Sequence, residues 1–140
     1  MTSTDVLYNI NRALVASYNV QALGLPTAYE MRDFPVPASA PWVALHGLDS
    51  GRNVSSMGSN GMDLWRGIFQ IDVHVPENSS TAGILGYTDT LLEYYSAGKW
   101  LEYNGQRVRI RRSEPSSIRK DEGPSYAKSV SVYWESWSQR

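Results

Sequence analysis

The feature that most constrains the fold is a twelve-residue segment of alternating hydrophobicity, Leu64–Val75. Because successive side chains of a β-strand point to opposite faces of a sheet, this alternation predicts a strand with one buried face. The strand is about twice the usual length, and Pro76 ends it. The predicted buried face comprises Trp65, Gly67, Phe69, Ile71, Val73 and Val75, and the other face carries Arg66, Ile68, Gln70, Asp72 and His74.

The rest of the chain predicts two helices and five more strands. Helical spacing of apolar residues indicates helices at 4–22 and 80–97, with Ser80 among the N-cap candidates and Gly98 as the C-cap of the second. Gly83 and Gly86 weaken that helix, and we expect them to let it pack close to the sheet. The Asn104-Gly105 pair is typical of a type I′ hairpin turn. Strands are predicted at 27–31, 42–46, 100–103, 106–112 and 126–135.

This order, α-β-β-β-α-β-β-β, predicts an α+β fold. We expect a single domain, 1–140, with a mixed, mainly antiparallel sheet and two helices packed on it. Two polar segments, about 47–62 and 113–125, are predicted as flexible loops because they are rich in Gly, Ser, Asn and Pro. A loop as long as the first is usually functional or disordered, and both interpretations stay open.

Composition excludes several classes of protein. The chain contains no cysteine, which rules out disulfides, zinc–thiolate sites and cysteine nucleophiles. The net charge of -1 is untypical of a protein that coats nucleic acid. This small total hides a separation of charge, since residues 1–98 hold four basic and nine acidic side chains and residues 99–120 hold seven basic and two acidic.

The sequence indicates no enzyme, metal or cofactor site. Motifs for nucleotide binding, zinc-dependent hydrolysis and nucleophilic catalysis are absent from the sequence. His46 and His74 lie in different predicted strands, without a cluster of ligands at metal-binding spacing. Asp72 and His74 share one strand face, where a polar pair commonly faces solvent. We therefore predict no catalytic, cofactor-binding or metal-binding residues.

A row of arginines is the strongest polar feature. In the strand 106–112, Val108 and Ile110 are predicted to point inward, so that arginines at alternate positions line up about 7 Å apart on the other face. Three interpretations are open: contact with nucleic-acid phosphates, pairing with acidic groups of a partner subunit, or a solvated, charge-protected sheet face. The candidate interface consists of Arg107, Arg109, Arg111, Arg112, Arg119, Lys120 and Trp137, the last as an exposed aromatic residue near the C-terminal end.

The arrangement resembles the tail terminator proteins of long-tailed bacteriophages, the small family similar to the lambda-type minor tail protein U. The resemblance covers about residues 4–135. Its most specific part is the motif Gly-x-Phe-Gln-Ile-Asp-Val-x-x-Pro at Gly67–Pro76, followed by a helix containing Leu91–Tyr95 and a Gly-Lys-x-Leu turn at Gly98–Leu101. The N-terminal helix, the short strand beginning at Trp42 and the terminal strand Val130–Trp134 also match.

The resemblance implies a structural virion protein without enzymatic activity. Such a protein caps the tail tube, ends its polymerisation and forms a ring, usually of six copies, that joins the tail to the head. The implied partners are other copies of the chain, the tail tube protein and the head–tail connector protein, with DNA passing through the ring and no membrane involved. The implied location is the virion tail, assembled in the host cytoplasm. Two alternatives are another head–tail neck or completion protein, and a small enzyme or ligand-binding domain using Asp72 and His74.

Overall fold

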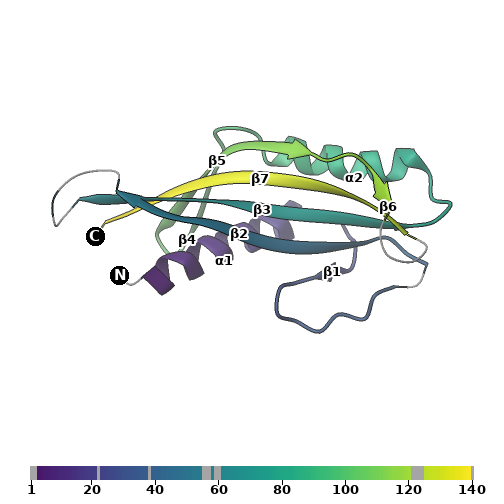
Figure 1. Cartoon of the computed structure of the whole chain (residues 1–140), viewed down its shortest axis with the longest axis horizontal. Helices are drawn as coiled ribbons and strands as arrows, with labels where there is room; N and C mark the ends of the chain where they lie inside the picture. The colour runs from purple at the N-terminus through teal and green to yellow at the C-terminus, as the bar shows by residue number, and fades with distance from the viewer. Residues whose placement is uncertain are drawn as a thin grey trace.

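The protein is seen here in a computed structural model, which describes residues 3–21, 23–37, 39–54, 58, 61–120 and 125–139. These residues form the predicted α+β fold, with one short strand added (Figure 1). The elements are α1 (Ser3–Gln21), β1 (Thr27–Ala28), β2 (Trp42–Val54), β3 (Met62–Pro76), α2 (Thr81–Tyr94), β4 (Trp100–Tyr103), β5 (Gln106–Pro115), β6 (Arg119–Lys120) and β7 (Ser125–Gln139).

The strands form one sheet in the order β1-β2-β3-β7-β5-β4, with β6 also paired to β7. All pairs are antiparallel except β1 with β2. The long strands β3 and β7 lie at its centre and pair over their whole length, from Met62 opposite Gln139 to Pro76 opposite Ser125 (Figure 1). The mixed, mainly antiparallel sheet is therefore as predicted.

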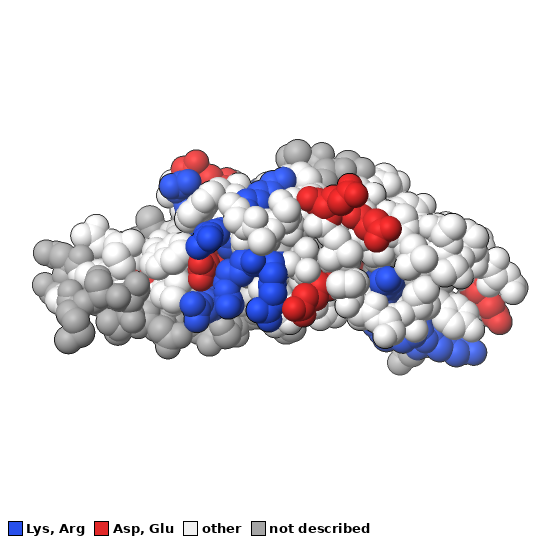
Figure 2. Space-filling view, turned by 90° about the horizontal axis from the view of Figure 1, so that it is seen from above, with Lys and Arg blue, Asp and Glu red and all other residues white. Residues whose placement is uncertain are grey.

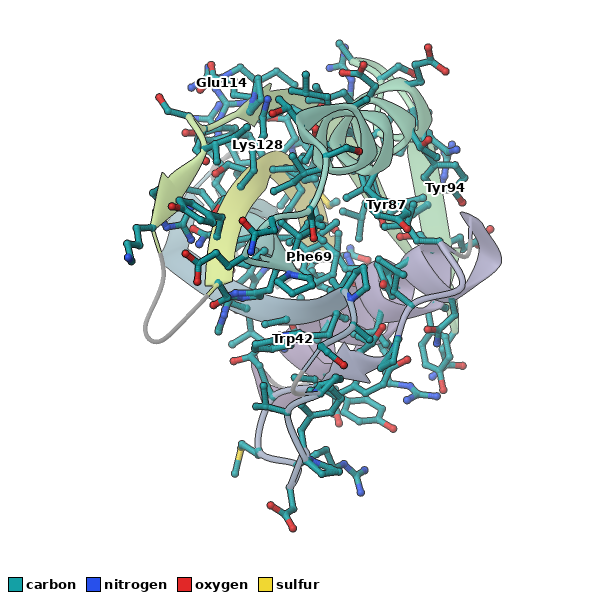
Figure 3. The ribbon with its side chains drawn as sticks, turned by 90° about the vertical axis from the view of Figure 1, so that its right-hand side faces the viewer. Trp42, Phe69, Tyr87, Tyr94, Glu114 and Lys128 are labelled. Atoms are coloured by element: carbon teal, nitrogen blue, oxygen red, sulfur yellow. The ribbon has the colours of Figure 1, made fainter. Side chains whose placement is uncertain are left out.

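Both helices pack on one face of the sheet, because the predicted apolar face of β3 points toward them. Side chains from α1, α2 and five strands form a single core that includes Ile10, Phe69 and Trp134. The helices also meet each other, since the hydroxyl groups of Ser17 and Tyr95 are hydrogen-bonded at 2.9 Å. Figure 3 shows Phe69 between the sheet and the helices. No helix among the described residues covers the opposite face, here called the outer face of the sheet.

The two polar segments contain more strand than predicted. β2 continues to Val54 and pairs with β3 up to Asp63, and β5 continues to Pro115. The short strand β6 lies inside the second segment. Backbone hydrogen bonds between strands do not require apolar side chains, so composition alone did not indicate this pairing. Residues 55–57, 59–60 and 121–124 lie outside the described residues, and the flexibility of both segments stays a prediction.

The strand predicted at 27–31 and the second helix also end earlier than predicted. The strand predicted at 27–31 ends at Ala28, and Met31 has a φ of 58°, which is incompatible with an extended strand. α2 ends at Tyr94 rather than at residue 97, and Gly98 lies in the following turn with a φ of 88°. The predicted N-cap is confirmed, because the hydroxyl of Ser80 accepts a hydrogen bond from the amide of Gly83. The Asn104-Gly105 turn is also confirmed, with φ values of 50° and 82°.

Candidate functional site

The predicted arginine row lies on the outer face of β5, but a β-bulge changes its geometry. Val108 and Ile110 point into the core as predicted. The pairing of β5 with β7 shifts between Ile110 and Arg112, so Arg112 takes the next position opposite Tyr133 and Arg111 is the extra residue. Arg107, Arg109 and Arg111 are all exposed, and Arg109 and Arg111 reach the same carboxylate, while the bulge brings Arg112 onto the outer face as well.

Three arginines converge on a buried glutamate. Glu135 lies opposite Arg66 of β3 on one side and Arg109 of β5 on the other. Its carboxylate oxygens lie 3.4 Å from Arg109, 3.6 Å from Arg66 and 3.9 Å from Arg111, each measured to a guanidinium nitrogen. The Glu135 side chain is 9% exposed, whereas each arginine is between one third and one half exposed. The cluster therefore carries two more positive than negative charges.

Aromatic rings hold two further arginines beside this cluster. Arg107 lies over Trp100 at 4.3 Å from the ring centroid, and Arg112 lies over Tyr133 at 4.1 Å. Such stacking orients a guanidinium group while its edge can bind a carboxylate, as Arg112 does with Glu114 at 3.0 Å. We call the set Arg66, Arg107, Arg109, Arg111 and Arg112 the basic patch. Figure 2 shows blue side chains gathered around a single red one in this region.

Trp137 forms one end of the patch together with Trp100. Their ring centroids are 6.2 Å apart. Trp137 is half-buried rather than fully exposed, and Trp100 is the more accessible of the two at 44%. Sequence reasoning missed Trp100, because its position on the edge strand β4 follows from the pairing of β4 with β5. Tryptophan and arginine together are the residues most enriched where protein partners bind.

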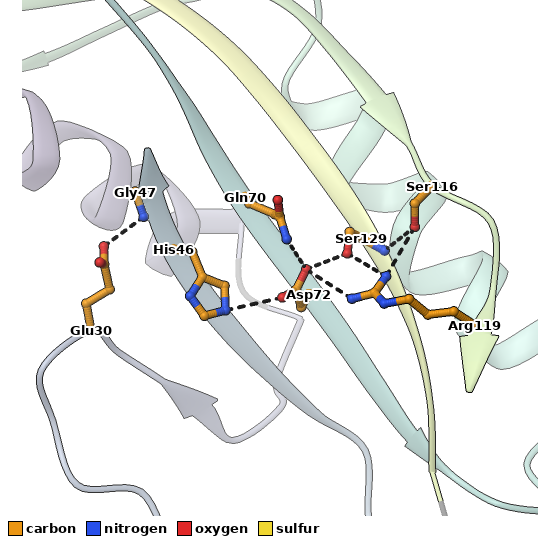
Figure 4. Close-up of polar contacts among 8 residues, drawn as sticks. All are labelled: Glu30, His46, Gly47, Gln70, Asp72, Ser116, Arg119 and Ser129. Carbon is orange, nitrogen blue, oxygen red and sulfur yellow. Dashed lines mark hydrogen bonds and ion pairs between the residues drawn. The ribbon is translucent and has the colours of Figure 1, made fainter. Parts of the chain in front are cut away.

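Arg119 and Lys120 lie apart from the basic patch, on β6. Arg119 donates a hydrogen bond to the hydroxyl of Ser129 at 2.8 Å, and its guanidinium lies 3.7 Å from the carboxylate of Asp72 (Figure 4). Asp72 also accepts hydrogen bonds from Ser129 and Gln70. Arg119 therefore ties β6 to the centre of the sheet, while Lys120 is exposed.

The two histidines lie on different strands, as predicted, and contact different residues. Nε2 of His46 lies 3.2 Å from Asp72, across the β2–β3 pairing, and His74 stacks on Trp42 with ring centroids 3.9 Å apart. Two cavities, of about 700 and 200 Å³, are lined by other residues. Among the described residues, no group of three His, Asp or Glu side chains is placed to hold a metal ion, and no helix is both long and apolar enough to cross a membrane.

Comparison with known proteins places the chain in a family. The model of a family described as phage tail terminator protein matches residues 9–134. The chain belongs to the phage tail terminator family. The resemblance found in the sequence is thereby confirmed, and the terminator is a structural component of the virion tail.

A solved structure gives independent support for the fold. It superposes on 97% of this chain and 96% of its own with a TM-score of 0.72 and 15% sequence identity, and its name does not describe a function. At this identity the likeness shows the fold alone. No curated protein sequence matches the terminator significantly.

The centre of the basic patch was not predictable by reading strands one at a time. Arg66 and Glu135 are 69 positions apart in the sequence, and only the β3–β7 register makes them neighbours. The one available signal was the alternation of side chains between the two faces of a strand. Glu135 occupies a position one residue away from the inward-facing Trp134, which assigns it to the outer face.

Proposed function

We propose that the terminator forms a closed ring, of six copies, that caps the tail tube, ends its polymerisation and joins the tail to the head connector. The family match over residues 9–134 carries this proposal. The ring assembles in the host cytoplasm from copies of this chain, and it contacts the tail tube protein on one side and the connector protein on the other. DNA passes through the ring without sequence-specific binding.

The charge distribution supports a ring. A closed ring is built from heterologous contacts, in which one surface of a subunit meets a different surface of the next. The outer face of the sheet offers an accessible surface with a net positive charge, and most of the acidic residues lie in other parts of the chain. The residues predicted for this interface are Arg107, Arg109, Arg111, Arg112, Arg119, Lys120 and Trp137. We add Arg66 and Trp100 to the proposal, because they contact Glu135 and Arg107 respectively.

Tube capping is tested by assembly. Purified terminator is mixed with tail tube subunits, and tube lengths and ends are measured by negative-stain electron microscopy. The expected result is short tubes with a distinct disc at one end and no further growth when more tube subunits are added. Tubes that elongate as they do without the terminator would refute the capping role. A neck or completion protein would instead bind connector complexes and leave tube growth unchanged.

The basic patch is tested by substitutions that spare its centre. Reversing Arg109 or Arg111 would place a second carboxylate beside Glu135 and disturb the fold. Arg107 and Arg112 avoid this problem, because neither has an ion pair with Glu135 among the described contacts. We expect the double variant Arg107→Glu, Arg112→Glu to fold but to form fewer rings. Rings of normal yield from the folded variant would exclude these two residues from the interface.

A further inference from the structure

The outward side of α2 carries two acidic side chains with no ion pair among the described residues. Asp89 and Glu93 are both exposed and lie one helical turn apart. Like charges at this spacing repel each other, so the pair does not stabilise the isolated helix. Leu85, one further turn toward the N-terminal end, is 36% exposed and extends the same side with an apolar group.

Two exposed glycines leave this side of α2 without side chains at two positions. We expected Gly83 and Gly86 to let the helix approach the sheet, but this prediction is wrong. Ile84, Thr88 and Leu91 face the core, while both glycines are exposed. A Cβ atom added at Gly86 would meet nothing within 4 Å. Glycine disfavours helix and serves no internal packing at this position, so its small size is available for the close approach of another surface.

The basic patch has the complementary properties. Its three clustered arginines share one carboxylate, and Arg107 rests on the ring of the exposed Trp100. Positions 85 to 93 of α2 span about 12 Å along the helix axis. The patch spans the two strand spacings from β3 to β5, about 10 Å. The charges are opposite, the dimensions agree, and each surface offers one exposed apolar residue, Leu85 or Trp100.

We infer that the outward side of α2 in one copy of the terminator docks on the basic patch of the next copy. Asp89 and Glu93 pair with exposed guanidinium groups of the patch, where three arginines share one carboxylate, and Leu85 packs near Trp100. The neighbour's helix thereby covers part of the outer face of the sheet, which no described helix of its own chain covers. The two surfaces consist of different residues of the chain, as a heterologous contact requires. This inference rests on the proposed ring and names its contact.

Charge exchange tests the contact. The variant Asp89→Arg, Glu93→Arg is assayed for ring formation by sedimentation and electron microscopy, with and without tube ends. We expect it to need at least about tenfold more protein than the wild type for half-maximal assembly, since like charges now meet across the contact. Adding Arg107→Glu and Arg112→Glu restores assembly toward the wild-type value. The control Asp33→Lys, Glu77→Lys makes a comparable change in net charge at exposed sites elsewhere and leaves assembly unchanged.

A second variant separates the contact from the stability of the fold. Gly86→Gln improves helix propensity, so it should raise the melting temperature of the subunit while weakening ring formation by placing a side chain on this side of α2. The inference is wrong if the folded variant Asp89→Arg, Glu93→Arg or the folded variant Gly86→Gln assembles as the wild type does. It is also wrong if adding Arg107→Glu and Arg112→Glu does not restore assembly. Either result would leave the proposed ring itself intact. If the wild type itself forms no rings on tube ends, the proposed function fails instead.

Discussion

Replacing Glu135 by glutamine should destabilise the terminator more than removing any exposed ion pair. The carboxylate lies 3.4 to 3.9 Å from three guanidinium nitrogens. At about 3.6 Å, one pair of unit charges is worth roughly 1 kcal/mol even in the dielectric of water. Three contacts therefore supply about 3 kcal/mol of attraction, and relief from burying a charge offsets part of it. We expect the free energy of unfolding to fall by about 1 to 3 kcal/mol.

The matched control is Glu114→Gln. Glu114 lies only 3.0 Å from Arg112, but both side chains are about half exposed, so its loss should cost less than about 1 kcal/mol. Stability is measured by urea denaturation, monitored by tryptophan fluorescence, at low salt and at 1 M NaCl. The Glu135→Gln penalty should shrink at high salt, because the unmasked repulsion among arginines is then screened. Equal penalties for the two variants, or a salt-independent difference, would refute the argument.

Three further predictions concern stability. Burial raises the pKa of Tyr95 above its ordinary value of 10.0, so the contribution of Tyr95 to the free energy of unfolding should be fully present below pH 10 and fall as the pH rises further. In Tyr95→Phe the free energy of unfolding should decline less steeply at alkaline pH, and an unchanged decline would contradict the role of Tyr95. Met31 is fully exposed with a φ of 58°, so Met31→Gly should raise the free energy of unfolding by about 0.5 to 1 kcal/mol in urea, and an unchanged or lower value would contradict this account. Ser80→Ala should cost about 1 kcal/mol in thermal or urea unfolding, whereas Ser80→Gly should cost only a few tenths.

The elements that the sequence predicted best are those whose pattern is local. The strand containing Phe69 alternates over its length because one face packs against helices and the other does not. The hairpin turn at Asn104 was predictable because few dipeptides tolerate two positive φ angles. The continuation of β2 to Val54 was missed, since its pairing with β3 uses backbone groups and leaves no apolar pattern in a segment rich in glycine and serine.

The candidate site shows where local reasoning ends. Alternation placed the arginines of β5 on the correct face, but no glycine or proline at or next to Arg111 marks the bulge there. Glu135 received no role, because its partners come from β3 and β5 and are set by register over long separations. Register depends on the whole hydrophobic pattern of the sheet rather than on any single strand.

A buried carboxylate on an uncovered sheet face has a physical consequence for binding. Long arginine side chains lose substantial conformational entropy when a partner fixes them. At the basic patch, Glu135 already restrains three of them, and Trp100 and Tyr133 restrain Arg107 and Arg112. Under the proposed docking of α2, much of this entropy is lost on folding rather than on assembly, so each contact yields more affinity. Glu135→Gln should therefore weaken ring formation even at temperatures where the subunit stays folded, although Glu135 itself is too buried to contribute much surface to the neighbour.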